Sequence, residues 1–478
     1  MLSRLAELEA IARRLEPSAS ERDALIAPVL SYTNTFLDTI DTRLTYVDTA
    51  DQGIGIYDSP IGETPVGINE LLAMVAQHVD RPGINPASGG HLGYIPGGGI
   101  FHSALGDYLA DITNRYAGIF FASPGAVRME HMLTRWMASM VGFPATSAGN
   151  LTSGGSIANL IGVVTARDAR GVTAREIPRS VIYLTAHVHH SVDKAIRIAG
   201  LRECVIRHIE MDAGHRMSPD ALDRQITADR AAGLRPFLVI ASAGTTDVGA
   251  VDPLPAIGDI ADRHELWLHV DGAYGAFFAL CDEGRKVLRG MDRADSIIMD
   301  PHKGLFLPYG SGAVLIKDTR AMQASHFYVA NYMQDALSAQ DEASPADLSP
   351  ELTKHFRGMR LWLPLKLLGV APFRAALEEK MWLARYFRER LLEIPGFDVG
   401  PAPDLSVVTF RYIPATGDVT AFNQRLVQAI HSDGRVFLSS SVIDGQFTIR
   451  LAVLAFRTHR STIDLTLEIL QEKVAALI

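Results

Sequence analysis

Cysteine is scarce in this chain: its 478 residues include only two, Cys204 and Cys281. Two cysteines cannot build the disulfide framework that holds small secreted domains together, so that class of protein is excluded. The scarcity indicates a reducing compartment, in which thiols stay free.

Long apolar runs are missing as well. No uninterrupted apolar stretch approaches the roughly 18 residues of a membrane-spanning helix, so we expect no transmembrane segment. Charges interrupt the N-terminal sequence MLSRLAELEAIARRLEP, which excludes a secretory leader, and Glu7, Glu9 and Glu16 are atypical of a mitochondrial presequence. We therefore expect a cytoplasmic protein. The apolar residues of this segment have the spacing of one helix face: Leu2, Leu5, Leu8, Ile11 and Leu15.

The chain also lacks an excess of basic residues. Lys and Arg total 45 whereas Asp and Glu total 54, a formal net charge of −9 at pH 7. Nucleic acids and anionic membranes select for basic surfaces, so we expect neither as a partner.

The sequence pattern divides the chain into three units, 1–85, 86–370 and 371–478, as expected at roughly 150 residues per domain. The first should contain helices joined by loops. In the second, short apolar runs alternate with helix-like segments such as 252–263, which predicts an α/β fold with a mostly parallel central sheet. The expected strands are 181–185, 204–209, 237–241, 266–270, 296–299 and 313–316.

The end of the chain is expected to form a small α+β domain. Its predicted strands are 407–412, 436–440 and 446–451, followed by a helix over 464–477. Between the units, the polar segment 336–349 has no apolar periodicity and is interpreted as a mobile surface loop. A long helix is expected from about Glu351.

The most informative motif is DSIIMDPHKGLFLPYGSG, residues 295–312. Lys303 comes directly after an apolar strand, where open α/β sheets bind their ligands. Partial burial there would favour the neutral, nucleophilic amine. The alternative is an ordinary surface lysine in a loop.

A second motif, LWLHVDGAYG, places Asp271 at the end of another apolar strand, before small residues. A buried carboxylate needs a partner, such as a cation or a protonated ring nitrogen. Alternatively, Asp271 caps the next helix.

Two further runs suggest ligand contacts. In LTSGGSIANL, residues 153–156 precede an apolar helical run and could bind an anion at the helix N-terminus, or could simply cap that helix. The histidines His187, His189 and His190 follow the strand 181–185; without Cys or acidic residues at zinc-site spacing, a ring packed on a ligand is favoured over a metal site.

Together these runs supply an amine nucleophile, a buried acid, an anion site and a histidine ring, each at a different strand end. This set fits pyridoxal 5'-phosphate. The cofactor's aldehyde takes a lysine, its pyridine nitrogen takes a carboxylate, and its phosphate takes a helix N-terminus. The sequence therefore predicts this cofactor and no metal.

At this point the sequence resembles the group II pyridoxal-phosphate-dependent amino acid decarboxylases, a family that includes aromatic-L-amino-acid decarboxylase. The resemblance covers roughly residues 50–478. It is strongest in HVDGAYG, DPHKG, the Gly244-Thr245-Thr246 turn, SPGAVRME from Ser123 and HFRGMRLW from His355. It implies the fold of the type I pyridoxal-phosphate enzymes, as in aspartate aminotransferase.

The resemblance also implies roles for residues that hold the cofactor. Lys303 would bind its aldehyde covalently, and Asp271 would keep its pyridine nitrogen protonated, with Thr246 beside that acid. His189 would stack on the ring. The phosphate would be held by Gly155, Ser156 and His302.

The implied reaction is decarboxylation of an L-amino acid to its amine and CO2. Tyr332 matches the loop tyrosine that protonates the substrate carbanion, and the family's homodimer places that loop over the active site of the neighbouring subunit. Lys303, Asp271, His189 and Tyr332 would thus be the catalytic residues.

The chain departs from the animal aromatic decarboxylases at four positions. Gly304 stands where they carry tryptophan, Asp300 where they carry asparagine, Arg128 replaces a glutamate, and Ile157 stands where an acid is common. The resemblance therefore does not fix an aromatic substrate.

Two other functions compete. One is decarboxylation-dependent aldehyde synthesis, or another carbon–carbon lyase reaction on the same fold; related aldehyde synthases typically carry phenylalanine where Tyr332 stands, which favours simple decarboxylation. The other is a cofactor-binding regulator without turnover, and the absence of a basic patch in residues 1–85 argues against it.

Overall fold

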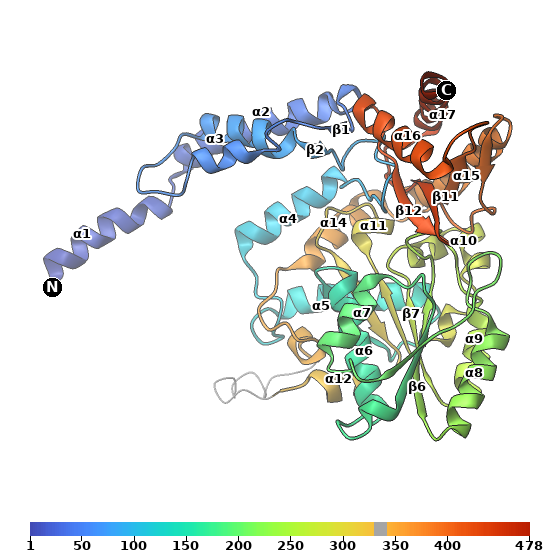
Figure 1. Ribbon diagram of the computed structural model, residues 1–478. Coiled ribbons are helices and arrows are strands. Elements are labelled where there is room, and N and C mark those ends of the chain that lie inside the picture. Colours follow the sequence, from blue (N-terminus) through green and yellow to red (C-terminus); the bar gives the residue numbers. More distant parts are fainter. Residues whose placement is uncertain (329–341) are drawn as a thin grey trace.

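Residues 1–328 and 342–478 are described by a computed structural model, at whose centre lies a seven-stranded sheet (Figure 1). The strand order is β3-β9-β8-β7-β6-β4-β5. Strands β5, β4, β6, β7 and β8 run parallel, and β9 lies antiparallel between β8 and β3. The strands are β3 (Ala148–Thr152), β4 (Ser180–Leu184), β5 (Val205–His208), β6 (Arg235–Ser242), β7 (Trp267–Asp271), β8 (Ser296–Met299) and β9 (Gly312–Ile316).

Both faces of this sheet are buried. Along β4, Val181 and Tyr183 face one core, and Ile182 and Leu184 face the other, as the period of two requires. One face is covered by α6 (Gly155–Ala169), α7 (His190–Ile198) and α12 (Thr319–His326). The opposite face is covered by α5 (Pro124–Met140), α8 (Pro219–Ala231) and α9 (Leu254–Arg263).

The end of the chain builds a second, antiparallel sheet of order β10-β11-β13-β12. Its strands are β10 (Phe397–Val399), β11 (Val407–Tyr412), β12 (Ser439–Ile443) and β13 (Gln446–Ala452). Helices α16 (Val419–Asp433) and α17 (Arg460–Leu477) pack on it around a separate apolar core. The long helix α15 (Ala371–Leu392) contributes Met381 to the core of the large sheet and Phe387 to that of the small one.

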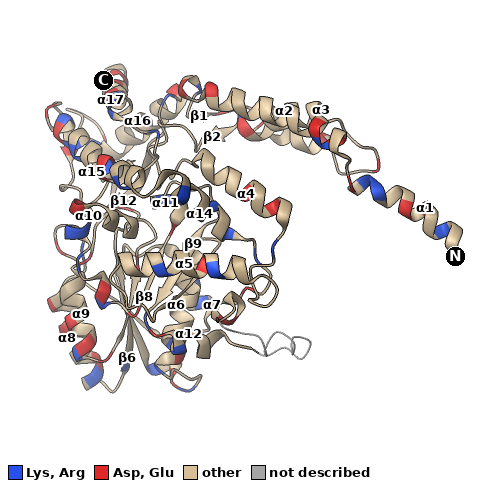
Figure 2. Ribbon diagram, turned by 180° about the vertical axis from the view of Figure 1, so that it is seen from behind, with Lys and Arg blue, Asp and Glu red and all other residues tan. Residues whose placement is uncertain are grey.

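The first helices project from this body as an arm (Figure 1). They are α1 (Leu2–Ala12), α2 (Ala19–Asp38) and α3 (Ile68–Val75), and none of their residues, all of which the structure describes, is buried. The middle of α2 carries no charged residue between Asp23 and Asp38, and in Figure 2 this helix is mostly tan. The arm thus presents apolar surface to solvent.

The predicted strands of the large sheet are confirmed within two residues at each end. Strand β3 was not predicted, because its sequence AGNLT contains a buried asparagine, Asn150, in place of an apolar run. The predicted strand 436–440 is displaced: β12 begins at Ser439. The backbone of Phe437 instead bonds to Gly90 and Leu92, so the apolar run belongs to a different pairing.

Two expectations about the segment before α15 are wrong. Residues 342–349, the described part of the predicted mobile loop 336–349, are packed: Ser344 is fully buried and its Oγ accepts a hydrogen bond from the backbone of Phe120 at 3.0 Å. The helix expected from Glu351 begins later, as α14 (Arg357–Leu368). Lys354, in the intervening chain, is buried, and its Nζ lies 2.6 Å from Oε2 of the buried Glu130.

Among the residues described, no helix is both long and apolar enough to cross a lipid bilayer.

Candidate active site

A cavity of about 330 Å³ lies at the carboxyl ends of the central strands β6, β7 and β8. This edge is where parallel α/β sheets bind ligands. The described residues proposed from the sequence all line it: Gly155, Ser156, His189, Thr246, Asp271, His302 and Lys303. Tyr332 lies outside the described residues.

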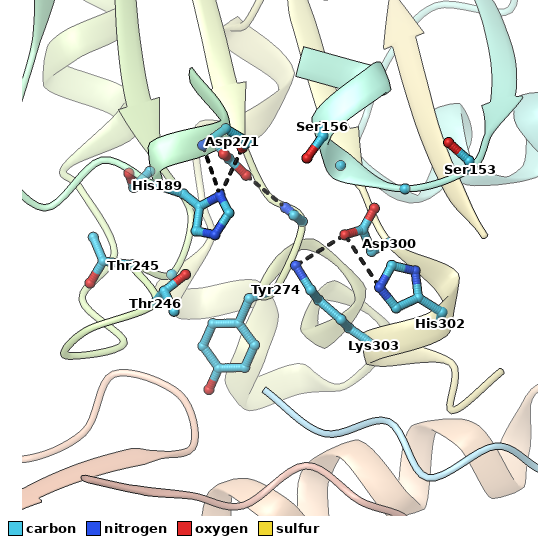
Figure 3. A pocket seen from close by; sticks show the side chains of 16 residues that line it. Ser153, Ser156, His189, Thr245, Thr246, Asp271, Tyr274, Asp300, His302 and Lys303 are labelled. Carbon is cyan, nitrogen blue, oxygen red and sulfur yellow. Dashed lines mark hydrogen bonds and ion pairs between the residues drawn. The ribbon is translucent and has the colours of Figure 1, made fainter. Parts of the chain in front are cut away.

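Lys303 lies on α11 (Pro301–Gly304), a single helical turn directly after β8. Its Nζ is 3.0 Å from Oδ2 of Asp300, and its side chain is 22% exposed, so the amine is accessible from the cavity (Figure 3). His302, next to it, lies with Nδ1 2.5 Å from the carbonyl of Ser311, which makes Nδ1 a donor. Burial lowers the pKa of His302, so the ring tends to be neutral.

Asp271 ends β7 and is buried. Its Oδ2 accepts a hydrogen bond from Nδ2 of Asn159 at 3.0 Å, and its Oδ1 accepts one from the backbone of Ala273 at 3.1 Å. Both donors are neutral. They hold the carboxylate in place, and among the residues that the structure describes no oppositely charged side chain forms an ion pair with it.

The same Asn159 nitrogen orients His189. It donates to Oγ of Ser191 at 3.0 Å, and Ser191 lies 2.7 Å from Nδ1 of His189. The Ser191 backbone also donates to that Nδ1, which is therefore an acceptor, and the ring proton sits on Nε2. Burial lowers the pKa of His189, in opposition to the charge of Asp271.

A buried histidine supports this arrangement from behind. Nε2 of His269 donates to Oδ1 of Asn159 at 2.8 Å, and Nδ1 lies 2.8 Å from Oγ of Ser296. Ser296 also accepts from the indole of Trp267. Full burial lowers the pKa of His269 to about 4, so the ring stays neutral and fixes the orientation of the Asn159 amide.

The anion site predicted at residues 153–156 lies at the start of α6, where free backbone N–H groups and the helix dipole favour negative charge. Gly154 precedes the helix with a φ of +154°, a conformation that disfavours any side chain. The hydroxyl groups of Ser153 and Ser156 flank this turn (Figure 3). Gly155 packs against Asp300, since a Cβ on it would meet Oδ2 at 3.0 Å.

The loop that carries Thr246 is held by the small sheet. Arg450 of β13 donates to the carbonyl oxygens of Thr246 and Asp247, and to Oγ of Ser439 at 2.8 Å. Thr246, which the sequence predicts to lie beside Asp271, is thus held through its backbone by Arg450, about 200 positions further along the chain.

The other two histidines of the cluster do not line the cavity. His187 lies 3.5 Å from the carboxylate of Asp247 and stacks edge-on with His215, whereas His190 is exposed. Among the described residues, no group of three or more His, Cys, Asp or Glu side chains could hold a metal ion.

Gly304 does not open the cavity. A Cβ on Gly304 would come within 2.6 Å of Cβ of Phe277, a fully buried core residue, and Gly304 is not part of the cavity wall. The sequence difference from the animal aromatic decarboxylases at this position therefore concerns core packing.

Sequence reasoning missed Asn159 and Ser191 as site residues. Asn159 falls one turn into α6 and Ser191 in the first turn of α7, and both are typical of polar helix starts. The sequence offered only a weak signal: Asn159 is a polar residue in the apolar run IANLIGVV, and its partners lie far away along the chain.

Comparison with known proteins places the chain among enzymes that use pyridoxal phosphate. Residues 71–413 match the family described as the pyridoxal-dependent decarboxylase conserved domain. An aromatic-L-amino-acid decarboxylase from Bacillus atrophaeus is 36% identical over 386 residues, 80% of this chain and 78% of that protein. A phenylacetaldehyde synthase from Arabidopsis thaliana is 27% identical over 398 residues, 79% of this chain and 81% of that protein.

The fold is shared with solved structures. The structure of Oryza sativa TDC with PLP and tryptamine superposes with a TM-score of 0.90 at 24% identity, and the match covers 96% of this chain and 99% of that one. This likeness confirms the predicted fold class, including the mostly parallel central sheet.

Proposed function

The chain belongs to the pyridoxal-dependent decarboxylase family, and on that premise we propose how its own residues carry out the reaction. It is a pyridoxal-phosphate-dependent amino acid decarboxylase, which converts an L-amino acid to its amine and CO2. The observation that carries the residue assignment is the meeting of Lys303 and Asp271 in one cavity with the start of α6.

The residues present fit the cofactor. Within residues 1–328 and 342–478, Asp271 accepts hydrogen bonds from neutral donors only, so its charge is left for a protonated ring nitrogen. The start of α6, with Gly155, Ser156 and His302, offers donors for a phosphate. Lys303, in the same cavity as Asp271 and the start of α6, supplies a primary amine.

When bound, pyridoxal phosphate supplies an aldehyde carbon that condenses with amines and a pyridinium ring that accepts the electron pair left by CO2. Lys303 would provide the amine that holds the aldehyde carbon. Asp271 would keep a proton on the ring nitrogen, and Asn159, which donates a hydrogen bond to its Oδ2, would hold that carboxylate in position. Thr246 lines the same cavity as that acid.

His189 and Tyr332 act on the substrate side. We assign His189 to packing over the ring, with its Nε2–H facing the cavity because Nδ1 is engaged by Ser191. Tyr332 would hold the proton that is delivered to the α-carbon after CO2 leaves.

The experiment is a product assay on the full-length chain. Aromatic, acidic and basic L-amino acids are each supplied, and CO2, amine, aldehyde and hydrogen peroxide are measured. The names of the relatives make aromatic amino acids the first substrates to test, and Gly304, which faces Phe277, is no argument against them. Equimolar amine and CO2 supports the proposal; absence of CO2 from every amino acid contradicts it.

Aldehyde synthesis is the second candidate, since the relatives include a phenylacetaldehyde synthase. Tyr332 distinguishes the two, because a proton donor at the α-carbon directs the reaction to the amine. Tyr332→Phe should raise the ratio of aldehyde to amine. An unchanged ratio would remove Tyr332 from this role, and aldehyde as the main product of the unaltered protein would favour the second candidate.

We also propose a homodimer whose active site is shared between the subunits. The exposed apolar side chains of the arm support it, among them Leu25, Val29 and Leu30 on α2, since monomers rarely leave such a surface uncovered. A second copy would cover these residues and bring the segment with Tyr332 to the neighbouring cavity.

The remaining proposals concern organisation and location. We propose that residues 1–85, 86–370 and 371–478 are the three structural units, which the separate core of the last sheet supports. A cytoplasmic location is supported by the two cysteines, Cys204 and Cys281, which are free and buried.

A further inference from the structure

Two loops that carry cavity residues are joined by a side-chain contact outside the cavity wall. His189 follows β4 and Thr246 follows β6, and both residues line the cavity (Figure 3). The parallel pairing of these two strands ends before either loop begins. Beyond it, Nδ1 of His187 lies 3.5 Å from Oδ2 of Asp247. Since His187 is two residues from His189 and Asp247 is next to Thr246, this contact links the two stretches of backbone that carry the cavity residues.

The small sheet contacts the same aspartate. Oγ of Ser441, on β12, donates a hydrogen bond to Oδ1 of Asp247 at 2.7 Å. Arg450, on β13, is buried and donates through Nε to the backbone carbonyl of Asp247, also at 2.7 Å. Asp247 is therefore the residue at which the loop of His189, the loop of Thr246 and the small sheet meet.

The contacts of Asp247 favour its ionised form. The hydrogen bond with His187 has the largest effect and lowers the pKa of Asp247, and Ser441 and Arg450 lower it further, against the effect of burial. An ionised carboxylate accepts hydrogen bonds at both oxygens, so it can engage His187 and Ser441 at the same time. Asp247 is not part of the cavity wall, and its effect on the reaction must therefore pass through its neighbours.

We propose that Asp247 is a positioning residue for the decarboxylation. Its carboxylate fixes the separation of His189 and Thr246 and ties both to the small sheet. A displacement of about 1 Å in a group that aligns the reacting atoms can cost about 100-fold in rate, even when its cause lies outside the site. The inference rests on the proposed function, because it takes His189 and Thr246 to contact the cofactor or the substrate.

The test compares Asp247→Ala with Asp404→Ala in the full-length protein loaded with pyridoxal phosphate. Asp404 is the matched control, because its carboxylate accepts hydrogen bonds from Arg216 and from the backbone of Val251, neither of which lines the cavity. Asp247→Ala should lower kcat for CO2 release about 10- to 100-fold and change KM by less than about threefold. It should also change the visible circular dichroism of the bound cofactor, which reports how the ring lies in the site. Asp404→Ala should lower the Tm and leave kcat and the spectrum unchanged.

Ser441→Ala tests the same link from β12, and it serves if Asp247→Ala does not fold. It should lower kcat about 3- to 10-fold, and the double variant should match Asp247→Ala, because the hydroxyl acts through that carboxylate. Normal kcat and an unchanged spectrum in Asp247→Ala and Ser441→Ala, or equal losses in Asp404→Ala, would overturn the inference. The proposed function fails differently: in that case the unaltered protein releases no CO2 from any amino acid.

Discussion

The Nδ2 atom of Asn159 lies 3.0 Å from Oδ2 of Asp271 and also 3.0 Å from Oγ of Ser191. One amide group therefore positions both the acid proposed to face the ring nitrogen and, through Ser191, the histidine proposed to pack on the ring. His269 in turn fixes which way that amide points. The site residues are thus held by a buried polar network that runs from His269 through Asn159 to Asp271 and, through Ser191, to His189.

Removal of this amide should impair turnover more than folding. Because a hydrogen bond to a charged group contributes about 1.5–3 kcal/mol, Asn159→Ala should lower kcat roughly 10- to 100-fold. The matched control is Asn423→Ala, which removes a buried asparagine bonded to the backbone of Tyr412 in the small sheet. It should lower the Tm and leave kcat of the folded protein unchanged. A normal kcat for Asn159→Ala would contradict the positioning role.

Position 304 should tolerate no large side chain. Gly304→Trp should destabilise the protein by about 1–3 kcal/mol or more through overpacking against Phe277. Phe277→Ala alone should cost about 3–5 kcal/mol through the cavity that it leaves. Since each change offsets the other's packing defect, the double variant should lose less free energy of unfolding than the two single variants combined. Denaturant unfolding measures this difference. Strict additivity would show that the two positions do not share space.

Acid should destabilise the protein through His91. This ring is 3% exposed, and burial lowers its pKa to about 4. The unfolded chain has a histidine pKa near 6.5, so between pH 6.5 and about 4 the unfolded state binds more protons. The free energy of unfolding should therefore fall as the pH drops through this range, by up to about 3 kcal/mol from this residue.

His91→Phe keeps the ring contact with Phe437 and removes the titration, so it should flatten this part of the stability profile. His208→Gln, at an exposed strand end, should leave the profile unchanged. Urea titrations at several pH values measure the free energy of unfolding of both variants. A profile as steep in His91→Phe as in the unaltered protein would assign the acid sensitivity to other groups such as His269.

The arm should be required for dimer formation. If two chains of 52.0 kDa associate, light scattering coupled to size exclusion should give about twice that mass. Leu30→Glu, a residue 54% exposed on α2, should weaken the dimer at least tenfold, because it places a charge in the proposed interface. Leu392→Glu, 53% exposed at the end of α15, is the matched control and should remain dimeric. A monomeric unaltered protein would refute the proposal directly.

The sequence was informative where a strand and the functional residue at its end are neighbours along the chain. The apolar run 296–299 predicts β8, and Lys303 follows it within four residues, so the strand end and its amine could be read together. Asp271 after β7 is the same case. Strand β3 could not be found this way, because the partner of its buried Asn150 is Lys354, which lies 204 positions away and donates a hydrogen bond to the Asn150 side chain.

The role of Asn159 likewise depends on distant partners. Its contact with Asp271 spans 112 positions and exists only because α6 packs against the sheet. Ser344 was assigned to a surface loop on composition, yet its hydroxyl meets the backbone of Phe120 in the interior. Polar residues satisfied by tertiary hydrogen bonds look the same in sequence as exposed ones, which is why these positions were not predictable.

The most direct test of the account is to locate the bound cofactor. The full-length protein is loaded with pyridoxal phosphate, reduced with borohydride, digested and analysed by mass spectrometry, with Lys303→Ala as the comparison. The account predicts that the reduced cofactor is attached to Lys303, and that the alanine variant neither retains it nor releases CO2 from any amino acid. Cofactor attached to another lysine, or undiminished CO2 release by Lys303→Ala, would contradict it.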